Sequence, residues 1–213
     1  MLLHSVVVAA CWVLPAFLLW KVSRKSGQSQ KAPVNRAVPK VNVRIVDYHK
    51  DGVLVGALLN AYSKDPMGDG QPLPEDIQKN VASELAKVPG AFSVLAFADD
   101  VAVGLCNCLE GFSTFKCKRL INIHDCFVLP DHRGLGAVDA MLNEVERVAT
   151  ARGACKITLE VLSNNPRAQR VYNRNGFEAY QLDPAAGHAL FWQKVLKSPA
   201  SSKRRGSKSP ARR

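Results

Sequence analysis

The chain has no acidic residue near either end. Residues 1–40 contain six lysines and arginines and residues 197–213 contain seven, with no aspartate or glutamate in either stretch. The middle, residues 41–196, therefore holds 16 of the 29 basic residues and all 18 acidic ones, a net charge of about −2. A middle without a basic surplus argues against a folded domain that grips a nucleic-acid backbone. Contacts with polyanions are expected only from the two ends.

The sequence also lacks the cysteine spacings of a metal site or a disulfide framework. Its six cysteines, at positions 11, 106, 108, 117, 126 and 155, form no Cys-x-x-Cys pair and no Cys/His pattern typical of zinc. A chain of 213 residues can build a core without disulfides, so we expect reduced thiols and no metal. Cys106 and Cys108, two apart in an apolar run, are expected to pack on one face of a strand.

Residues 1–20 contain no charged side chain and are mostly apolar. At about 1.5 Å per residue, a helix of this length spans one bilayer. Lys21, Arg24 and Lys25 follow at once, which predicts a membrane-anchored protein with its remaining residues in the cytoplasm. Two alternatives stay open. No acidic residue precedes Asp47, which also fits a mitochondrial presequence, and the start codon can be wrongly assigned.

Two further segments are not expected to fold. Residues 21–40, above all Ser26 to Pro39, are rich in polar residues, alanine and proline without a helical period, which is typical of a linker. Residues 197–213 form a basic tail with no aromatic or branched apolar side chain, so it cannot bury enough surface to fold. An anionic lipid surface or a nucleic acid is the partner that such a tail suits, and its Ser-Pro pairs are candidate phosphorylation sites.

Residues 41–196 are predicted to form one domain of the α+β class. Periodicity and turn residues predict strands at 41–46, 92–98, 101–109, 120–129, 156–162 and 188–195, and helices at 53–62, 76–88, 137–152 and 165–175. The expected order, β-α-α-β-β-β-α-β-α-β-β, ends in two strands, of which 188–195 is the last. Its first half is mostly antiparallel and its second half resembles βαβ units, so we expect a mixed central sheet flanked by helices.

The loop from Pro130 to Ala137 joins a predicted strand to a predicted helix. Gly134 and Gly136 allow successive backbone N–H groups to face one concavity at the positive end of the helix dipole, which suits a diphosphate. The loop is not a P-loop, since it lacks Gly-Lys-Ser/Thr, and Asp139 replaces the third glycine of the dinucleotide fingerprint. Taken alone, the two glycines fit a simple tight turn equally well.

A second motif, Asn165-x-x-Ala168-x-x-x-Tyr172-x-x-x-Gly176-Phe177, begins 29 residues after Gly136. Together with Arg133-Gly-Leu-Gly136 and the preceding Val-Leu-Pro, it resembles the GNAT superfamily of acetyl-CoA-dependent N-acetyltransferases. The resemblance covers roughly residues 41–196. It is closest to small bacterial-type members without an assigned acceptor, to which Asp65-Pro-Met-Gly68 and Asn122-Ile-His-Asp125 are also similar.

The resemblance implies transfer of acetyl from acetyl-CoA to a primary amine, by direct attack in a ternary complex and without a metal. It implies that the strand backbone at Cys126, Phe127 and Val128 pairs with the pantetheine arm. The pyrophosphate would be held by the first motif, residues Arg133, Gly134, Leu135, Gly136, Ala137 and Val138. Asn165, Ala168 and Tyr172 would also contact the coenzyme, and Tyr172 would be the general acid on its sulfur. Val138 departs from the family, which has glycine or alanine there.

The transfer also needs a base, because only a neutral amine attacks a thioester. Relatives carry Glu-Asp where this chain has His124-Asp125, and a histidine, with an ordinary pKa of about 6.5, suits this task. Adjacent strand residues point to opposite faces, so both cannot face one cleft without a bulge. A structural histidine bonded to Asn122 or to a loop carbonyl is the competing interpretation.

The acceptor side is expected between the two early helices and the loop at 65–73, where Asp65 and Asp69 suit a cationic amine. The acceptor can be a small polyamine-like or aminoglycoside-like molecule, or a protein amine. Two other functions stay open. Val138 and the missing strand glutamate suggest a domain that binds coenzyme A without turnover, and the two ends suggest a membrane-tethered scaffold that acts through its basic tail.

Overall fold

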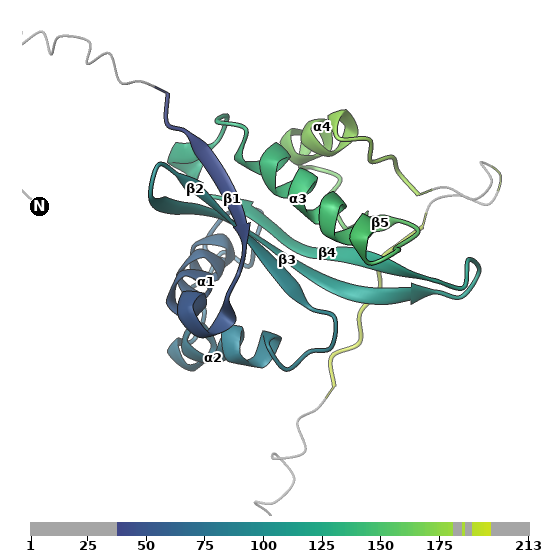
Figure 1. Cartoon of the computed structure of the whole chain (residues 1–213), viewed down its shortest axis with the longest axis horizontal. Helices are drawn as coiled ribbons and strands as arrows, with labels where there is room; N and C mark the ends of the chain where they lie inside the picture. The colour runs from purple at the N-terminus through teal and green to yellow at the C-terminus, as the bar shows by residue number, and fades with distance from the viewer. Residues whose placement is uncertain (1–37, 181–184, 186–188, 197–213) are drawn as a thin grey trace, which may run out of the picture. The chain divides into compact units, whose positions relative to one another are not determined.

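The computed structural model describes residues 38–180, 185 and 189–196, which contain five strands and four α-helices (Figure 1). The strands are β1 (Val41–Ile45), β2 (Phe92–Ala98), β3 (Val101–Ser113), β4 (Lys118–Val128) and β5 (Ile157–Leu159). The helices are α1 (Tyr48–Ser63), α2 (Glu75–Leu85), α3 (Ala137–Ala151) and α4 (Pro166–Arg174), and a 3-10 turn, η1 (Pro130–His132), precedes α3. Each element predicted between residues 41 and 175 is present.

The five strands form one mixed sheet in the order β1-β2-β3-β4-β5. From β1 to β4, adjacent strands pair antiparallel, whereas β5 pairs with β4 in parallel. Helices α1 and α2 lie on one face of the sheet, and α3 and α4 lie on the other (Figure 1). This arrangement confirms the predicted α+β class with a mixed central sheet.

Both faces of the sheet are buried, which explains why its central strands are apolar almost throughout. Val94 and Cys106 pack with Met141 of α3 on one face, while Leu95 and Leu105 pack with α1 on the other. Alternate residues of β2 and β3 thus serve different clusters, as a period of two requires. Cys106 and Cys108 lie on the same face and are fully buried, as their spacing predicts.

Helix α1 begins five residues earlier than its apolar period predicts, because polar side chains cap it. The Asp47 carboxylate accepts a hydrogen bond from the His49 N–H, and the buried Asp51 carboxylate accepts one from the Asp47 N–H. Arg44 of β1 closes this end with bonds of 2.6 and 2.8 Å to Asp51. Such caps stabilise a helix start by about 0.5–2 kcal/mol. They also fix α1 to the first strand.

The prediction of a last strand at 188–195 is wrong for the residues that the structure describes. Residues 189–195 form no strand in the structure, and His188 lies outside the described residues. The side chains of Leu190, Phe191 and Trp192 are 73–83% exposed. Aromatic and branched residues favour a strand only when a neighbouring strand supplies hydrogen bonds. The edge strand nearest in sequence, β5, is only three residues long instead of the seven predicted, so it offers few backbone groups for another strand to pair with.

The predicted anchor (1–20), the basic tail (197–213) and residues 21–37 of the predicted linker lie outside the described residues. Within the described part, no helix is long and apolar enough to cross a bilayer. The division into anchor, linker, domain and tail therefore stays a prediction. Cys11 also lies outside the described part, and the five described cysteines are free thiols.

Candidate active site

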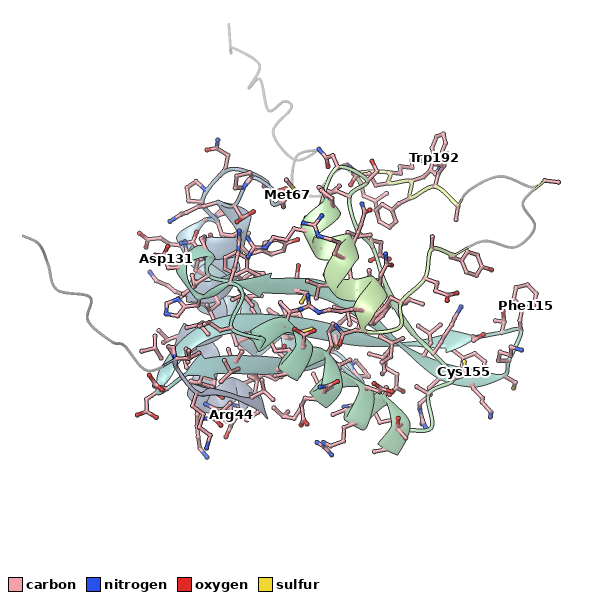
Figure 2. All side chains as sticks on the ribbon, turned by 90° about the horizontal axis from the view of Figure 1, so that it is seen from above. Arg44, Met67, Phe115, Asp131, Cys155 and Trp192 are labelled. Carbon is pink, nitrogen blue, oxygen red and sulfur yellow. The ribbon has the colours of Figure 1, made fainter. Side chains whose placement is uncertain are left out.

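A cavity of about 690 Å³ lies beside the second half of β4, on the side of α3 and α4. Its walls come from β4, from the loop before α3, from α4, and from the end of α1 with the loop after it. Met67 of that loop lies toward one end of the sheet, whereas Phe115 marks the far tip of the β3–β4 hairpin (Figure 2). The residues that carry the two sequence motifs therefore meet in one place, although they are far apart in the chain.

The loop before α3 has the conformation that its glycines predict. Gly134 and Gly136 have φ of 85° and 81°, a region that side chains other than glycine rarely adopt. Gly136 is the N-cap of α3 and has no side chain with which to cap the first-turn N–H groups, which lie beside the cavity. The acidic residue of that turn, Asp139, is paired with Arg174 and Asn175. An anion fits this helix end.

Arg133 joins two loops through contacts that the sequence motif alone does not reveal. Its Nε donates to the Val128 carbonyl at 2.9 Å, and its Nη2 lies 2.5 Å from Asp65 in the loop after α1. Burial favours a higher pKa for Asp65, but the Met67 N–H and the Arg133 guanidinium outweigh it, so this pKa is lowered. Arg133 thus ties the loop after α1 to the loop before α3.

Three other arginines, all in α4, line the cavity, and sequence analysis missed all three; of these, Arg174 is paired with Asp139. Arg167 and Arg170 lie three residues apart in α4 and border the same space as the N-terminus of α3. The signal was present in the sequence, since basic residues at i and i+3 after the cap Asn165 share one helix face. They supply positive charge where Arg133 is already paired.

The remaining residues of the first motif divide between cavity and core. Val138 and Ala137 line the cavity, although Ala137 is largely buried and Val138 also packs on the core. Leu135 does not line it and packs against the core instead. A buried atom of His132, its Nδ1, has no hydrogen-bond partner among the described residues, and this side chain borders the cavity. An unpaired polar atom and an uncapped helix end both fit an oxygen-rich ligand.

Asn165 caps α4 as predicted. Its side chain accepts a hydrogen bond of 3.1 Å from the Ala168 N–H, and Pro166 occupies the first helical position. Both Asn165 and Ala168 border the cavity, so the cap also shapes its wall.

Tyr172 of α4 lines the cavity and interacts with Cys126 of β4. Its ring meets Phe177 edge-on, with 5.8 Å between the centroids, and its hydroxyl hydrogen bonds with the Cys126 sulfur. Burial raises the pKa of Tyr172 well above its ordinary value, and the neighbouring thiols of Cys126 and Cys106 raise it further. Tyr172 therefore remains a neutral phenol near pH 7 and can donate a proton.

A β-bulge sits at His124. Asn107 of β3 pairs with Asp125, but the next residue, Cys108, pairs with Ile123, so one residue of β4 has no partner. As a result, Ile123 and Cys126 both face the core under α3. His124 is exposed and lines the cavity. The Asn122 amide donates to Thr158 and Glu160 of the β5 edge rather than to His124.

Asp125 turns away from this cavity and ends a buried chain of hydrogen bonds. The chain starts at Tyr48, whose hydroxyl bonds the Ser93 hydroxyl at 2.9 Å. Ser93 donates to Asn107 at 2.6 Å, and the Asn107 amide donates to Asp125 at 2.9 Å. Ser93 and Asn107 are the polar residues buried in β2 and β3, and each is satisfied by the other.

Residues 55–177, more than half of the chain, match the model of the acetyltransferase (GNAT) family. The chain belongs to this family. A GNAT relative, the uncharacterized N-acetyltransferase YhfO of Bacillus subtilis (strain 168), is 30% identical over 105 residues, which are 48% of this chain and 70% of that protein. The protein is accordingly an acyltransferase, as its resemblance predicted.

Other GNAT relatives have named acceptors. The thialysine N-epsilon-acetyltransferase of Bos taurus is 35% identical over 80 residues, 38% of this chain and 45% of that protein. The solved structure of the aminoglycoside N-acetyltransferase AAC(6')-Iy in complex with CoA superposes with a TM-score of 0.59 at 20% identity, covering 76% of this chain and 99% of that one. This second likeness shows the GNAT fold, not a shared acceptor.

Proposed function

We propose that the protein transfers acetyl from acetyl-CoA to a primary amine by direct attack in a ternary complex. One observation carries the proposal: a single cavity joins an uncapped helix N-terminus, the strand after the β4 bulge and a neutral tyrosine. The first could bind a pyrophosphate, the second the pantetheine arm, and the third could protonate a departing sulfur. AAC(6')-Iy, solved with CoA, has the same fold.

The polyphosphate end of the coenzyme would lie between α3 and α4. The backbone N–H groups of Gly136, Ala137 and Val138 would donate to the pyrophosphate, and Arg167 and Arg170 would supply charge. Because the backbone does most of this binding, Val138 need not prevent it. Backbone groups of Cys126, Phe127 and Val128 would pair with the pantetheine arm and place the thioester beside Tyr172.

In the transfer itself, the amine nitrogen attacks the thioester carbonyl, a C–N bond forms and the C–S bond breaks. The amine proton passes to His124, and Tyr172 gives a proton to the coenzyme A sulfur. His124 is supported by its position, since the bulge places it at the cavity and leaves it exposed to the acceptor. Each positioned acid or base contributes about 10²–10⁴-fold to a rate.

The acceptor would be a cationic amine, bound where Tyr62 and Met67 border the cavity. Burial raises the pKa of the Tyr62 phenol, and the nearby Asp125 carboxylate and Cys126 thiol raise it further, as Asp65 and Asp69 also do. Asp65 is already paired with Arg133, so Asp69, exposed in the same loop, is the carboxylate left to attract an ammonium group before it loses its proton. Thialysine and aminoglycosides, the acceptors in the relatives' names, are also amines.

The test is release of free thiol from acetyl-CoA by the full chain, across a panel of diamines, polyamines, lysine analogues and aminoglycosides. Tyr172→Phe is expected to lower kcat by about 10²-fold or more for the best amine. Tyr180→Phe is the matched control, since Tyr180 is exposed and lies off the cavity. Binding of acetyl-CoA without amine-dependent thiol release would support the alternative of a domain that does not turn over.

A pH–rate profile tests the base separately. Wild type should lose activity toward acidic pH, because protonated His124 cannot accept the amine proton. His124→Ala should abolish this acidic limb and lower the rate, whereas His49→Ala, on the exposed start of α1, should leave the profile unchanged. An unchanged acidic limb in His124→Ala removes His124 from the mechanism.

We further propose that residues 1–20 anchor the protein in a membrane with its catalytic domain in the cytoplasm, or direct it to the mitochondrion, and that residues 197–213 contact anionic lipid or nucleic acid. The uncharged first twenty residues and the basic ends support this. Carbonate extraction of cells that express the full chain, or a variant without residues 2–20, tests the anchor. Recovery of the full chain in the soluble fraction after carbonate treatment would overturn the proposed anchor.

A further inference from the structure

Three thiols gather on the face of the sheet that packs under α3 and α4. Cys106 and Cys108 lie on β3 with their sulfur atoms 3.9 Å apart, and Cys126 of β4 is the cross-strand partner of Cys106. Cys106 and Cys108 are 0% and 1% exposed. Cys126 is partly exposed and lines the cavity. Of the three, Cys126 is therefore the thiol that a ligand in the cavity can reach.

The surroundings of Cys126 favour its reactive form. The Cys106 thiol donates a hydrogen bond to the Cys126 sulfur, which lowers the pKa of Cys126. Burial opposes this, but the Tyr172 hydroxyl donates to the same sulfur and adds to the lowering. The thiolate is the form that reacts with oxidants and with other sulfur atoms. Cys117 and Cys155, by contrast, are exposed and lie off the cavity.

The second sulfur would come from the coenzyme, and this step rests on the proposed function. There, Tyr172 protonates the coenzyme A sulfur, so its hydroxyl would lie within hydrogen-bond distance of that atom. The same hydroxyl already contacts the Cys126 sulfur. Two sulfur atoms that share one hydroxyl are held close to each other, at the flexible end of the pantetheine arm. Acetyl-CoA in the same place offers no free thiol.

We propose that Cys126 is a modification site at which bound coenzyme A forms a mixed disulfide when a hydroperoxide is present. Hydrogen peroxide oxidises the Cys126 thiolate to a sulfenic acid and leaves as water after taking a proton. The free thiol of bound coenzyme A then attacks the sulfenic sulfur, an S–S bond forms and a second water leaves. The peroxide supplies both oxidising equivalents. The adduct fills the coenzyme site, so the enzyme is inactive until a thiol reduces it.

The experiment treats the full chain with hydrogen peroxide in the presence of coenzyme A, acetyl-CoA or desulfo-coenzyme A, and measures intact mass without reductant. With coenzyme A, the expected gain is one coenzyme less two hydrogens, on the peptide that contains Cys126. Activity should fall in proportion to the modified fraction and return with dithiothreitol. Acetyl-CoA and desulfo-coenzyme A should give no adduct.

Variants assign the site. Cys126→Ser should form no adduct, while Cys117→Ser and Cys155→Ser should form it like wild type. An adduct on Cys117 or Cys155, or a disulfide between Cys106 and Cys126 without coenzyme, would overturn the proposal. Calorimetry on the reduced chain separates two failures. Coenzyme A binding without the Cys126 adduct overturns this inference alone, whereas no binding overturns the proposed function and this inference together.

Discussion

Replacing Asn107 by leucine should destabilise the protein by removing the middle of the buried hydrogen-bond chain. Leucine has nearly the shape of asparagine, so the change removes hydrogen bonds more than it changes packing. Two bonds are lost, the 2.6 Å bond from Ser93 and the 2.9 Å bond to the Asp125 carboxylate. A neutral bond contributes about 0.5–1.5 kcal/mol and a bond to a charged group about 1.5–3 kcal/mol.

The two bonds sum to about 2–4.5 kcal/mol, and two features favour the lower half of that range. Ser93 can turn its proton toward Tyr48, since either hydroxyl can donate in that pair. Asp125 is only partly buried, so water replaces some of what it loses. A loss of about 2–3 kcal/mol lowers the melting temperature by about 4–12 °C for a domain of this size.

Urea unfolding followed by circular dichroism measures this loss. Asp125→Leu and the double variant complete a thermodynamic cycle, in which we expect a coupling of at least about 1 kcal/mol, because the two side chains touch. Asn122→Leu is the control, since its amide bonds only the exposed edge of the sheet. Stability of Asn107→Leu within about 0.5 kcal/mol of wild type, or additive effects in the cycle, would refute the reasoning.

Three further outcomes follow from single contacts. Gly56→Ala should destabilise the protein strongly, because the added Cβ would lie 2.1 Å from the Gln78 carbonyl oxygen where α1 crosses α2. Thermal unfolding measures this loss, with Gly52→Ala as the control. Gly136→Ala should lower the free energy of unfolding by about 1 kcal/mol, because alanine is strained at this positive φ. It should also weaken coenzyme A binding in calorimetry. Unchanged affinity would contradict the assignment of this helix end to the coenzyme. The Arg44 guanidinium lowers the pKa of Asp51, so Asp51→Asn should be less stable than wild type at pH 7, and the difference should vanish as acid protonates Asp51 below about pH 4.

Elements with a strong local signal could be predicted from the sequence. Helix α3 has apolar residues at three- and four-residue intervals, and α4 has its own cap and proline, so their bounds fall within one or two residues of the expectation. Helix α1 was predicted too short because Tyr48 to Asp51 carry no apolar period, and their helix depends on carboxylate contacts. Local patterns do not reveal such contacts before the chain is folded.

In the candidate site, too, some features follow from local sequence and others depend on contacts made only in the folded chain. The glycines of the loop before α3 and the cap Asn165 follow from local chemistry, whereas the pairing of Arg133 with Asp65 joins residues 68 apart in sequence and could not be derived from either motif. The last predicted strand failed for a related reason, since propensity alone supplies no hydrogen-bonded neighbour. The bulge could have been located: the β4 positions that pack under α3 are odd-numbered up to Ile123 and even-numbered from Cys126 onward.

That change of parity makes β4 sensitive to its length at one position. Most residues can replace His124 without disturbing the strand, because its side chain points to solvent. Removing the residue altogether is different. A shortened strand would regain strict alternation, and either Ile121 and Ile123 or Cys126 and Val128 would then have to leave the core beneath α3. The strand thus tolerates most substitutions at this position but not a deletion, and insertions or deletions elsewhere in the domain are better placed in the hairpin tip around Phe115.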